Sequence, residues 1–272
     1  MPGTTLRILS LNIWNYNEPW NRRRDLILET VLGENPDLIG FQEIRHHSAL
    51  DEGGLNQAQQ LAQHLPDYCY IYQPAQRNPE IDQWEGLAIF SRLPIKSSSF
   101  ISLTRDPNDS RDNHQRLVLR AEVETPVGPT HFFNTHFSLS RNARSRNVRE
   151  ITPFVGRHTG QLPHVLVGDF NETADEDPIQ YLTNEGGFLD AWPQIHPDDP
   201  GWTYSTANLY VNEKRETEAA EGRRIDYIFV HPQVGSRGQI LSCRIVADRS
   251  AEDGHFPSDH FGVIVDINLE ES

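Results

Sequence analysis

Short apolar runs recur along the chain, and most of them end in a polar side chain. The clearest run, residues 165–167, is typical of a strand buried on both faces. Gly168 ends it, and Asp169 and Asn171 follow. Because alternate residues of an extended chain point to the same side, we expect this carboxylate and this amide to project together. An Asx turn, in which both side chains bond to their own backbone, is the alternative.

The N-terminal pattern predicts a strand-helix-strand unit. Residues 6–12 and 36–43 are apolar runs that end in Asn12 and Glu43, and residues 22–33 between them carry an apolar stripe at helical spacing. Such a unit usually pairs its strands in parallel, with a cleft at their carboxyl ends. We therefore expect Asn12 and Glu43 at one edge of a sheet. A solvated charge at the end of a strand is the structural alternative for Glu43.

The remaining pattern is dominated by strands. Strands are predicted at residues 68–72, 86–90, 95–103, 117–123, 130–137, 224–230, 240–247 and 261–267, and helices at residues 54–65, 142–159 and 178–184. Loops are predicted at residues 105–115, 192–210 and 211–222, the last of them mobile because it is very polar. No repeat or linker divides the pattern, so residues 1–272 are expected to form one domain.

Two of the later strands carry an ionisable residue near one end. His136 lies at the end of its strand, where backbone hydrogen bonds usually account for a single histidine. Asp226 lies near the start of an apolar strand, and a buried carboxylate needs a partner. Asp226 therefore either belongs to a functional site or forms an ion pair with Arg223 or Arg224.

Asp259 and His260 immediately precede the last predicted strand. This adjacency suggests that the Asp259 carboxylate orients the imidazole and fixes its tautomer, directly or through another group. An imidazole has an intrinsic pKa near neutrality, which suits it to proton transfer.

The chain is acidic, with 39 Asp and Glu against 24 Lys and Arg and a formal net charge of −15. This charge disfavours tight, nonspecific binding of a polyanion. It does not exclude a phosphate ester, because acidic residues around a cation contribute to the balance. Basic residues gather in one segment, at Arg141, Arg144, Arg146, Arg149 and Arg157. They are expected to form a solvated helix face, unless Arg144 or Arg146 reaches over the cleft toward an anion.

The sequence carries no strong signal for a disulfide, a signal peptide or a membrane span. Cys69 and Cys243 lie in mostly apolar stretches and are expected to be reduced core thiols. The N-terminus has no pattern of a signal peptide, and no apolar run approaches the ~18 residues of a membrane span. We expect a cytoplasmic monomer without stable membrane insertion. A secreted protein that had lost its leader would look the same.

Six motifs, in order along nearly the whole chain, resemble those of the endonuclease/exonuclease/phosphatase superfamily, which has the DNase I-like fold. They are Leu11-Asn12, Gln42-Glu43, Asn134-Thr135-His136, Gly168-Asp169-Phe170-Asn171, Arg224-Ile225-Asp226-Tyr227 and Ser258-Asp259-His260. The resemblance implies an α/β (α+β) fold, a four-layer αββα sandwich of two packed mixed β-sheets flanked by helices.

The resemblance also implies a phosphoesterase that depends on a divalent metal, usually Mg²⁺, with Mn²⁺ or Ca²⁺ as alternatives. Glu43 would be the main metal ligand. The wider set implied at the metal is Asn12, Glu43, Asp169, Asn171, Asp259 and His260. Oxygen ligands of this kind suit a hard cation, and no Cys/His spacing supports zinc.

Roles in catalysis follow from the same resemblance. Asp169 and Asn171 would position the attacking water and the phosphate, and His136 would donate to a phosphoryl oxygen. Asp259 and His260 would form an acid/base pair. Two further roles are implied: Asp226 would support the phosphate or orient its neighbours, and Glu85 would pair with His136.

The substrate stays open at this level. The leading hypothesis is hydrolysis of a phosphodiester or phosphomonoester by water that an Asp/His pair activates. A nuclease acting on DNA or RNA, a sphingomyelinase-like phosphodiesterase and a non-catalytic scaffold are alternatives, so the substrate is a small molecule, a lipid headgroup or a nucleic acid. Trp202, Tyr204 and Tyr210 either line a substrate pocket or simply anchor their loop.

Overall fold

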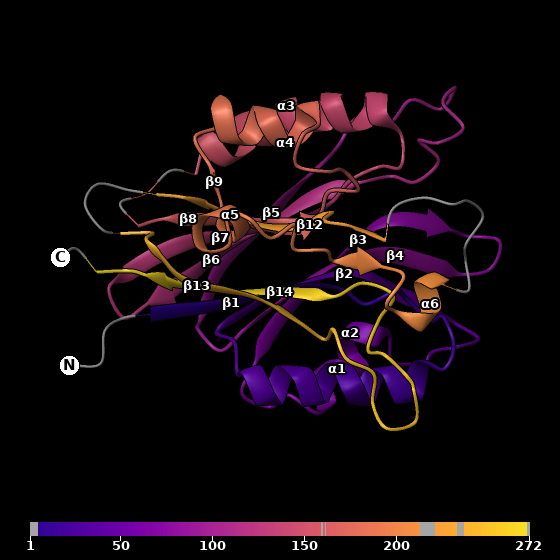
Figure 1. Cartoon of the computed structure of the whole chain (residues 1–272). Helices are drawn as coiled ribbons and strands as arrows, with labels where there is room; N and C mark the ends of the chain where they lie inside the picture. Colours follow the sequence, from indigo (N-terminus) through magenta and orange to yellow (C-terminus); the bar gives the residue numbers. More distant parts are fainter. Residues whose placement is uncertain (1–4, 159, 161, 213–220, 233–236, 271–272) are drawn as a thin grey trace.

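Two six-stranded β-sheets pack face to face, and helices cover the outer face of each, as a computed structural model shows (Figure 1). The structure describes residues 5–158, 160, 162–212, 221–232 and 237–270. This architecture confirms the predicted four-layer sandwich. Within the described residues, no helix is both long and apolar enough to cross a membrane.

The first sheet has the strand order β13-β14-β1-β2-β4-β3. Its strands are β1 (Thr5–Asn12), β2 (Leu38–His47), β3 (Cys69–Asn78), β4 (Gln83–Ser91), β13 (Ile240–Val246) and β14 (Gly262–Asn268). Helices α1 (Trp20–Glu34) and α2 (Gln57–Gln63) cover its outer face, where Ile27 and Val31 of α1 belong to the same apolar cluster as Leu9 of β1. α2 starts three residues later than the pattern suggested, because Asn56 and Gln59 form a capping box there.

The second sheet has the order β5-β6-β7-β8-β12-β9. Its strands are β5 (Ile95–Ser102), β6 (Leu117–Thr125), β7 (Gly128–His136), β8 (His164–Asp169), β9 (Leu189–Asp190) and β12 (Asp226–His231). Helices α3 (Arg141–Gly156) and α4 (Asp177–Asn184) form the layer outside it. Phe154 of α3 and Leu182 of α4 belong to the same apolar cluster as Phe229 of β12.

Each sheet has a parallel pair of strands at its centre, and both pairs end at the same edge of the sandwich. β1 and β2 are parallel, with Asn12 opposite Gln42. β7 and β8 are parallel, with His136 opposite Asp169. This confirms the expected pairing of the N-terminal unit. The polar strand ends of both sheets therefore lie close to one another.

The two sheets approach each other closely between these strands. A Cβ atom on Gly40 of β2 would lie 2.4 Å from Cγ2 of Val167 on β8, so only glycine fits there. Beside it, the buried Asn134 side chain of β7 reaches across the core. Its Nδ2 donates to the carbonyl oxygens of Phe41 (2.9 Å) and Ala88 (3.0 Å), and its Oδ1 accepts from Nε2 of Gln42 (2.8 Å). These bonds fix how one sheet is placed on the other.

Several predictions about local structure were wrong. Residues 192–210 are not simply a loop, because they include α5 (Ala191–Ile195), β10 (Tyr204–Ser205) and part of α6 (Leu209–Asn212). Of the predicted loop 211–222, residues 213–220 lie outside the described residues, as does residue 159, and Gly222 belongs to β11 (Gly222–Arg223). Cys243 is a buried thiol as expected, but Cys69 is exposed, because β3 is an edge strand.

Removal of the Asn134 side chain should destabilise the sandwich. Asn134→Ala removes the side-chain donor to two buried carbonyl groups and one acceptor of the Gln42 amide. We expect the free energy of unfolding to fall by about 3 kcal/mol, measured by chemical denaturation. Asn147→Ala is the matched control, since Asn147 is equally buried but, within the part of the chain that the structure describes, its Nδ2 bonds only the Thr104 carbonyl oxygen. An equal loss in the two variants would contradict a bridging role for Asn134.

Candidate active site

A cavity of about 330 Å³ opens where the polar strand ends of the two sheets meet. Most of the predicted site residues line it: Glu43, Glu85, His136, Asp169, Asn171, Asp259 and His260. Asn12 and Asp226 are buried behind it and bond to residues that line it. The structure therefore brings the predicted residues together from both sheets.

Glu43 is presented to the cavity by an irregularity in β2. The pairing of β2 with β4 shifts between Phe41 and Ile44, and Glu43 has a φ of 57°, a left-handed conformation that is strained for a non-glycine residue. Nδ2 of Asn12 donates to its Oε1 (3.1 Å) and Nδ2 of Asn15 to its Oε2 (2.8 Å). Burial, with repulsion from the Glu85 and Asp259 carboxylates, raises the pKa of Glu43.

Asp169 lies next to polar side chains that come from both sheets. Its Oδ2 accepts from Nδ2 of Asn12 (3.0 Å) and faces Nε2 of His136 (3.4 Å) and Nε2 of His260 (3.8 Å). Its Oδ1 accepts from the backbone N–H of Asn171 (2.8 Å). One carboxylate oxygen thus makes the Asx turn and the other faces the site. Burial and the neighbouring Asp226 raise the pKa of Asp169 to about 7.

The geometric reason given for pairing Asp169 with Asn171 was wrong. Asn171 has a φ of 52°, so the chain turns here instead of continuing as a strand. Its Nδ2 donates to the Phe137 carbonyl oxygen (3.0 Å), and its side chain still lines the cavity. The turn, and not strand alternation, brings the amide to the site.

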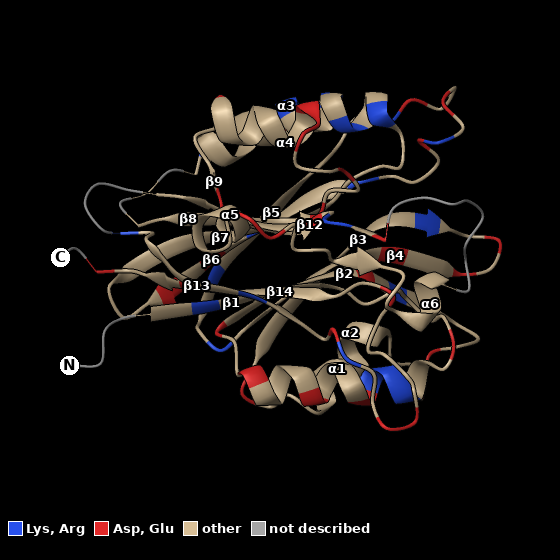
Figure 2. Cartoon of the chain, viewed as in Figure 1, with Lys and Arg blue, Asp and Glu red and all other residues tan. Residues whose placement is uncertain are grey.

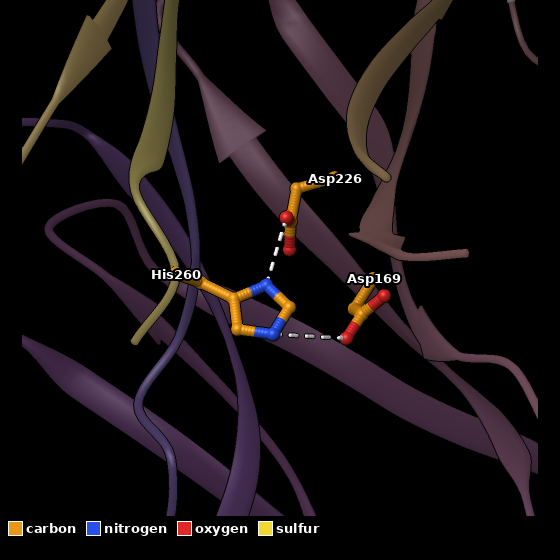
Figure 3. A group of neighbouring side chains, drawn as sticks. All are labelled: Asp169, Asp226 and His260. Atoms are coloured by element: carbon orange, nitrogen blue, oxygen red, sulfur yellow. Dashed lines mark hydrogen bonds and ion pairs between the residues drawn. The ribbon is translucent and has the colours of Figure 1, made fainter. Parts of the chain in front are cut away.

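Asp226, and not the adjacent Asp259, orients His260. Oδ2 of Asp226 lies 2.9 Å from Nδ1 of His260, while Nε2 of the same ring faces Asp169 (Figure 3). β8 and β12 place the two carboxylates opposite each other, because Asp226 pairs with Asp169 in their register. Burial lowers the pKa of His260, but Asp226 and Asp169 outweigh it and raise this pKa well above its usual range. His260 is therefore an imidazolium at neutral pH.

The predicted alternative for Asp226, an ion pair with a neighbouring arginine, was also wrong. Arg224 instead bonds both carboxylate oxygens of Asp190, at 2.9 and 2.7 Å. The guanidinium of Arg223 lies 5.6 Å from the centre of the Tyr204 ring. The Asp226 carboxylate therefore pairs with His260 and not with a neighbouring arginine.

His136 is held in one tautomer by Arg116. Nη1 of Arg116 lies 3.0 Å from Nδ1 of His136, and a guanidinium can only donate, so Nδ1 accepts and the ring proton lies on Nε2. Burial, together with the positive charges of Arg116 and His260, lowers the pKa of His136 well below its usual range. His136 is therefore neutral, with an N–H directed at Asp169.

Glu85 contacts His136 through an arginine and not directly, which corrects the expected pairing. Its carboxylate bonds Nη2 of Arg45 and lies 3.6 Å from Nη1 of Arg116. Burial raises the pKa of Glu85, but Arg116 and Arg45 outweigh it and hold this pKa below its usual range. Glu85 thus keeps Arg116 beside His136.

The arginines that line the cavity were missed by sequence reasoning. Arg45, Arg116 and Arg223 all line it, together with His114 and Asn15. A usable signal existed for Arg45, because it follows Glu43 by two residues on the same strand. Arg116 directly precedes β6, at the edge that carries the site.

The basic segment does not reach the cavity. The Arg144 guanidinium is buried against Glu172, and Arg146 bonds the Thr104 carbonyl oxygen and Asp112. Figure 2 shows the basic positions of α3 on the outermost helix layer. The proposal that Arg144 or Arg146 reaches over the cleft was therefore wrong.

Only one of the three loop aromatics lines the cavity. The Tyr204 ring lies there, with its centre 5.1 Å from that of the His260 ring. Tyr210 is buried in a cluster with Phe256 and Phe261, and Trp202 packs over Gly222. The last two anchor their loop.

Two groups of residues come into question for a cation. Ligand atoms of Asp169, Asp226 and His260 lie within 4.8 Å of one another. Asp226, however, does not line the cavity, and its carboxylate is already bonded to Nδ1 of His260. Glu43 and Asp259 do line it, and repulsion from the Asp259 carboxylate contributes to the raised pKa of Glu43. A cation relieves this repulsion, so the second group fits better.

Comparison with known proteins gives a family match over most of the chain. The model of the Endonuclease/Exonuclease/phosphatase family matches residues 9–260. Nocturnin of Drosophila melanogaster is 26% identical over an alignment of 281 positions that covers 92% of this chain and 42% of the relative. Nocturnin of Homo sapiens is 22% identical and is covered to 59%. The chain thus spans about half the length of these curated relatives.

Solved structures share the fold. An endonuclease/exonuclease/phosphatase from Bacteroides vulgatus has a TM-score of 0.75 and 23% identity, with 98% of this chain and all of that chain covered. TDP2 of D. rerio, solved with a single-strand DNA product, has a TM-score of 0.76 and 18% identity, with the same coverage. At these identities the likeness establishes the fold.

The role of Asp226 can be tested on His260 itself. In Asp226→Asn, the main carboxylate that raises the pKa of His260 is lost, so we expect this pKa to fall by about one unit or more. NMR titration of the imidazole in metal-free protein measures it. Asp259→Asn is the control, with a smaller fall expected, since Asp259 contributes least to the shift. A larger fall in the control would contradict the assignment.

Proposed function

The chain belongs to the endonuclease/exonuclease/phosphatase family, and from this we propose that it is a divalent-metal-dependent phosphoesterase. Its substrate is a phosphodiester or a phosphomonoester, attacked in line by water. One observation carries the proposal. The Glu43 carboxylate, which suits a cation, lines the same cavity as Asp169, the neutral His136 and His260. Asp226 holds the His260 ring from behind the cavity.

Glu43 would hold the cation, with Asp259 and Asn12 beside it. The Asn12 oxygen accepts from the Trp14 backbone N–H (2.9 Å) and its Nδ2 donates to Glu43 and Asp169, so Asn12 would position these carboxylates beside the cation. Mg²⁺ prefers one or two carboxylates together with water and phosphate, and this donor set fits Mg²⁺, Mn²⁺ or Ca²⁺. Such an ion stabilises charge on the phosphoryl oxygens and lowers the pKa of bound water.

Asp169 is the group proposed to accept the proton of the attacking water. A base works best when its pKa lies near the working pH, and the pKa of Asp169 is raised to about 7. The Asn171 side chain lines the cavity beside Asp169 and is proposed to help position the phosphate. The hydrogen bonds from Nδ2 of Asn12 to Oδ2 and from the Asn171 backbone N–H to Oδ1 hold this carboxylate in one orientation.

The two histidines are proposed to act as donors. His136, neutral with its proton on Nε2, donates to a phosphoryl oxygen. His260, an imidazolium held by Asp226, stabilises negative charge and can give its Nε2 proton to the leaving group. The Asp259 role changes accordingly: it contributes charge at the cation and does not orient His260.

Nucleic acid is the second candidate substrate. The fold neighbour TDP2 was solved with a single-strand DNA product, and Arg45, Arg116 and Arg223 bring positive charge to this cavity. The net charge of −15 opposes tight binding of long polyanions. A short oligonucleotide or a single nucleotide ester fits both observations.

A substrate panel tests the proposal. Bis-nitrophenyl phosphate, single-stranded DNA and RNA, sphingomyelin, and nucleotide and sugar phosphates are incubated with Mg²⁺, with Mn²⁺ and with chelator. We expect turnover that needs the metal, and a loss of about 10² to 10⁴-fold in Glu43→Gln and His260→Ala. Glu29→Gln, an exposed carboxylate on α1, is the matched control and should keep full activity. Turnover in chelator, or a fully active Glu43→Gln, would refute the mechanism.

A further inference from the structure

Arg23 of α1 is a fully buried arginine whose guanidinium bonds only to backbone carbonyl groups among the described residues. Its side chain also packs beside Trp14 and Trp20. Nη1 donates to the carbonyl oxygens of Ile13 (2.6 Å) and Pro257 (3.2 Å). Nη2 donates to the carbonyl oxygens of Asn15 (2.7 Å), Asn17 (2.6 Å) and Trp14 (3.4 Å). Nε donates to the Asn17 carbonyl oxygen as well (3.0 Å).

The first segment that Arg23 holds is a strained turn. Trp14 and Asn15 are consecutive non-glycine residues with φ values of 58° and 39°. Such conformations persist only where surrounding contacts hold them. This turn follows Asn12 directly and carries the Asn15 amide that donates to Oε2 of Glu43. The Arg23 bonds therefore set how an amide meets the proposed cation ligand.

The second segment lies at the other end of the chain. The Pro257 carbonyl oxygen accepts from Nη1 of Arg23, and two residues later the chain reaches Asp259 and His260. The same loop is tied to β1 by the Ser258 hydroxyl, which donates to the Asn12 carbonyl oxygen (2.6 Å). One guanidinium thus joins the two loops that flank Glu43.

The charge of Arg23 points the same way. A buried guanidinium without an ion pair is costly, and burial lowers the pKa of Arg23 to about 10, which still leaves it charged at neutral pH. Asp259 is the strongest of the carboxylates that oppose this shift, and Glu43 also opposes it. Carboxylates of the site therefore offset part of the cost of burying this charge.

We propose that Arg23 is a positioning residue that braces residues 13–17 against residues 257–260, so that Glu43 and Asp259 are aligned to bind the cation. This inference rests on the proposed function. Arg23 does not line the cavity. A lysine at this position would keep the charge but cannot reach carbonyl groups on both loops with a planar fork.

Arg23→Lys tests the brace. We measure binding of Mn²⁺ alone by calorimetry, kcat and KM on the best substrate of the panel, and backbone hydrogen exchange of both loops. We expect Mn²⁺ affinity and kcat to fall by about 10- to 100-fold, as for other residues that orient metal ligands, with KM little changed and both loops exchanging faster.

Two control variants separate positioning from general destabilisation. Arg24→Lys changes the neighbouring arginine, which pairs with the exposed Glu52, and should leave all readouts unchanged. Val31→Ala creates a core defect two turns along α1 and should lower thermal stability while Mn²⁺ affinity stays within about twofold. Loss of Mn²⁺ affinity in Val31→Ala equal to that in Arg23→Lys would overturn the proposal, as would wild-type affinity in Arg23→Lys.

If Arg23→Lys does not fold, wild-type protein decides. The Nε–H NMR signal of Arg23 should shift on addition of Mg²⁺ and that of Arg24 should not, and an unchanged Arg23 signal would overturn the proposal.

Failure of the proposed function has a different signature, namely wild-type protein that neither binds Mn²⁺ nor hydrolyses any ester. Hydrogen exchange in Arg23→Lys then still decides whether Arg23 holds the two loops.

Discussion

The Asn12 carboxamide joins the two halves of the site. Its Nδ2 donates both to Glu43, which comes from the first sheet, and to Asp169, which comes from the second. This bridge forms only if the sheets are placed correctly on each other, and the close approach of Gly40 to Val167 sets that placement. The Asn134 bonds across the core reinforce it. Packing in the middle of the sandwich thus controls geometry at its edge.

Environment gives chemically identical side chains different roles in this cavity. Of the two histidines, His136 lies beside Arg116 and is neutral, whereas His260 lies beside Asp226 and is charged. Of the carboxylates, Glu85 is compensated by arginines, while Asp169 is buried near another acid and holds a proton more readily. Pairs of titratable groups with pKa values moved apart are typical of acid–base sites.

The sequence predicted most of the strands, the parallel pairing of the N-terminal unit and most of the carboxylates and histidines that line the cavity, because apolar runs that end in polar groups are a local signal. Partner choice was not predictable. Whether Asp226 or Asp259 orients His260 depends on the register between β8 and β12, which no local pattern encodes. The buried Arg23 was missed for a similar reason, since an arginine in an amphipathic helix usually points to solvent. Cys69 was misplaced because the edge position of β3 follows from the whole sheet.

The central claim, that side chains from both sheets gather around one cation at Glu43, has a direct test. Crystals grown or soaked with Mn²⁺ give anomalous scattering that locates the ion without reference to activity. The account predicts one peak in contact with the Glu43 carboxylate, inside the cavity that Asp169 and Asp259 also line. A peak held between Asp226 and His260, with none at Glu43, would contradict it.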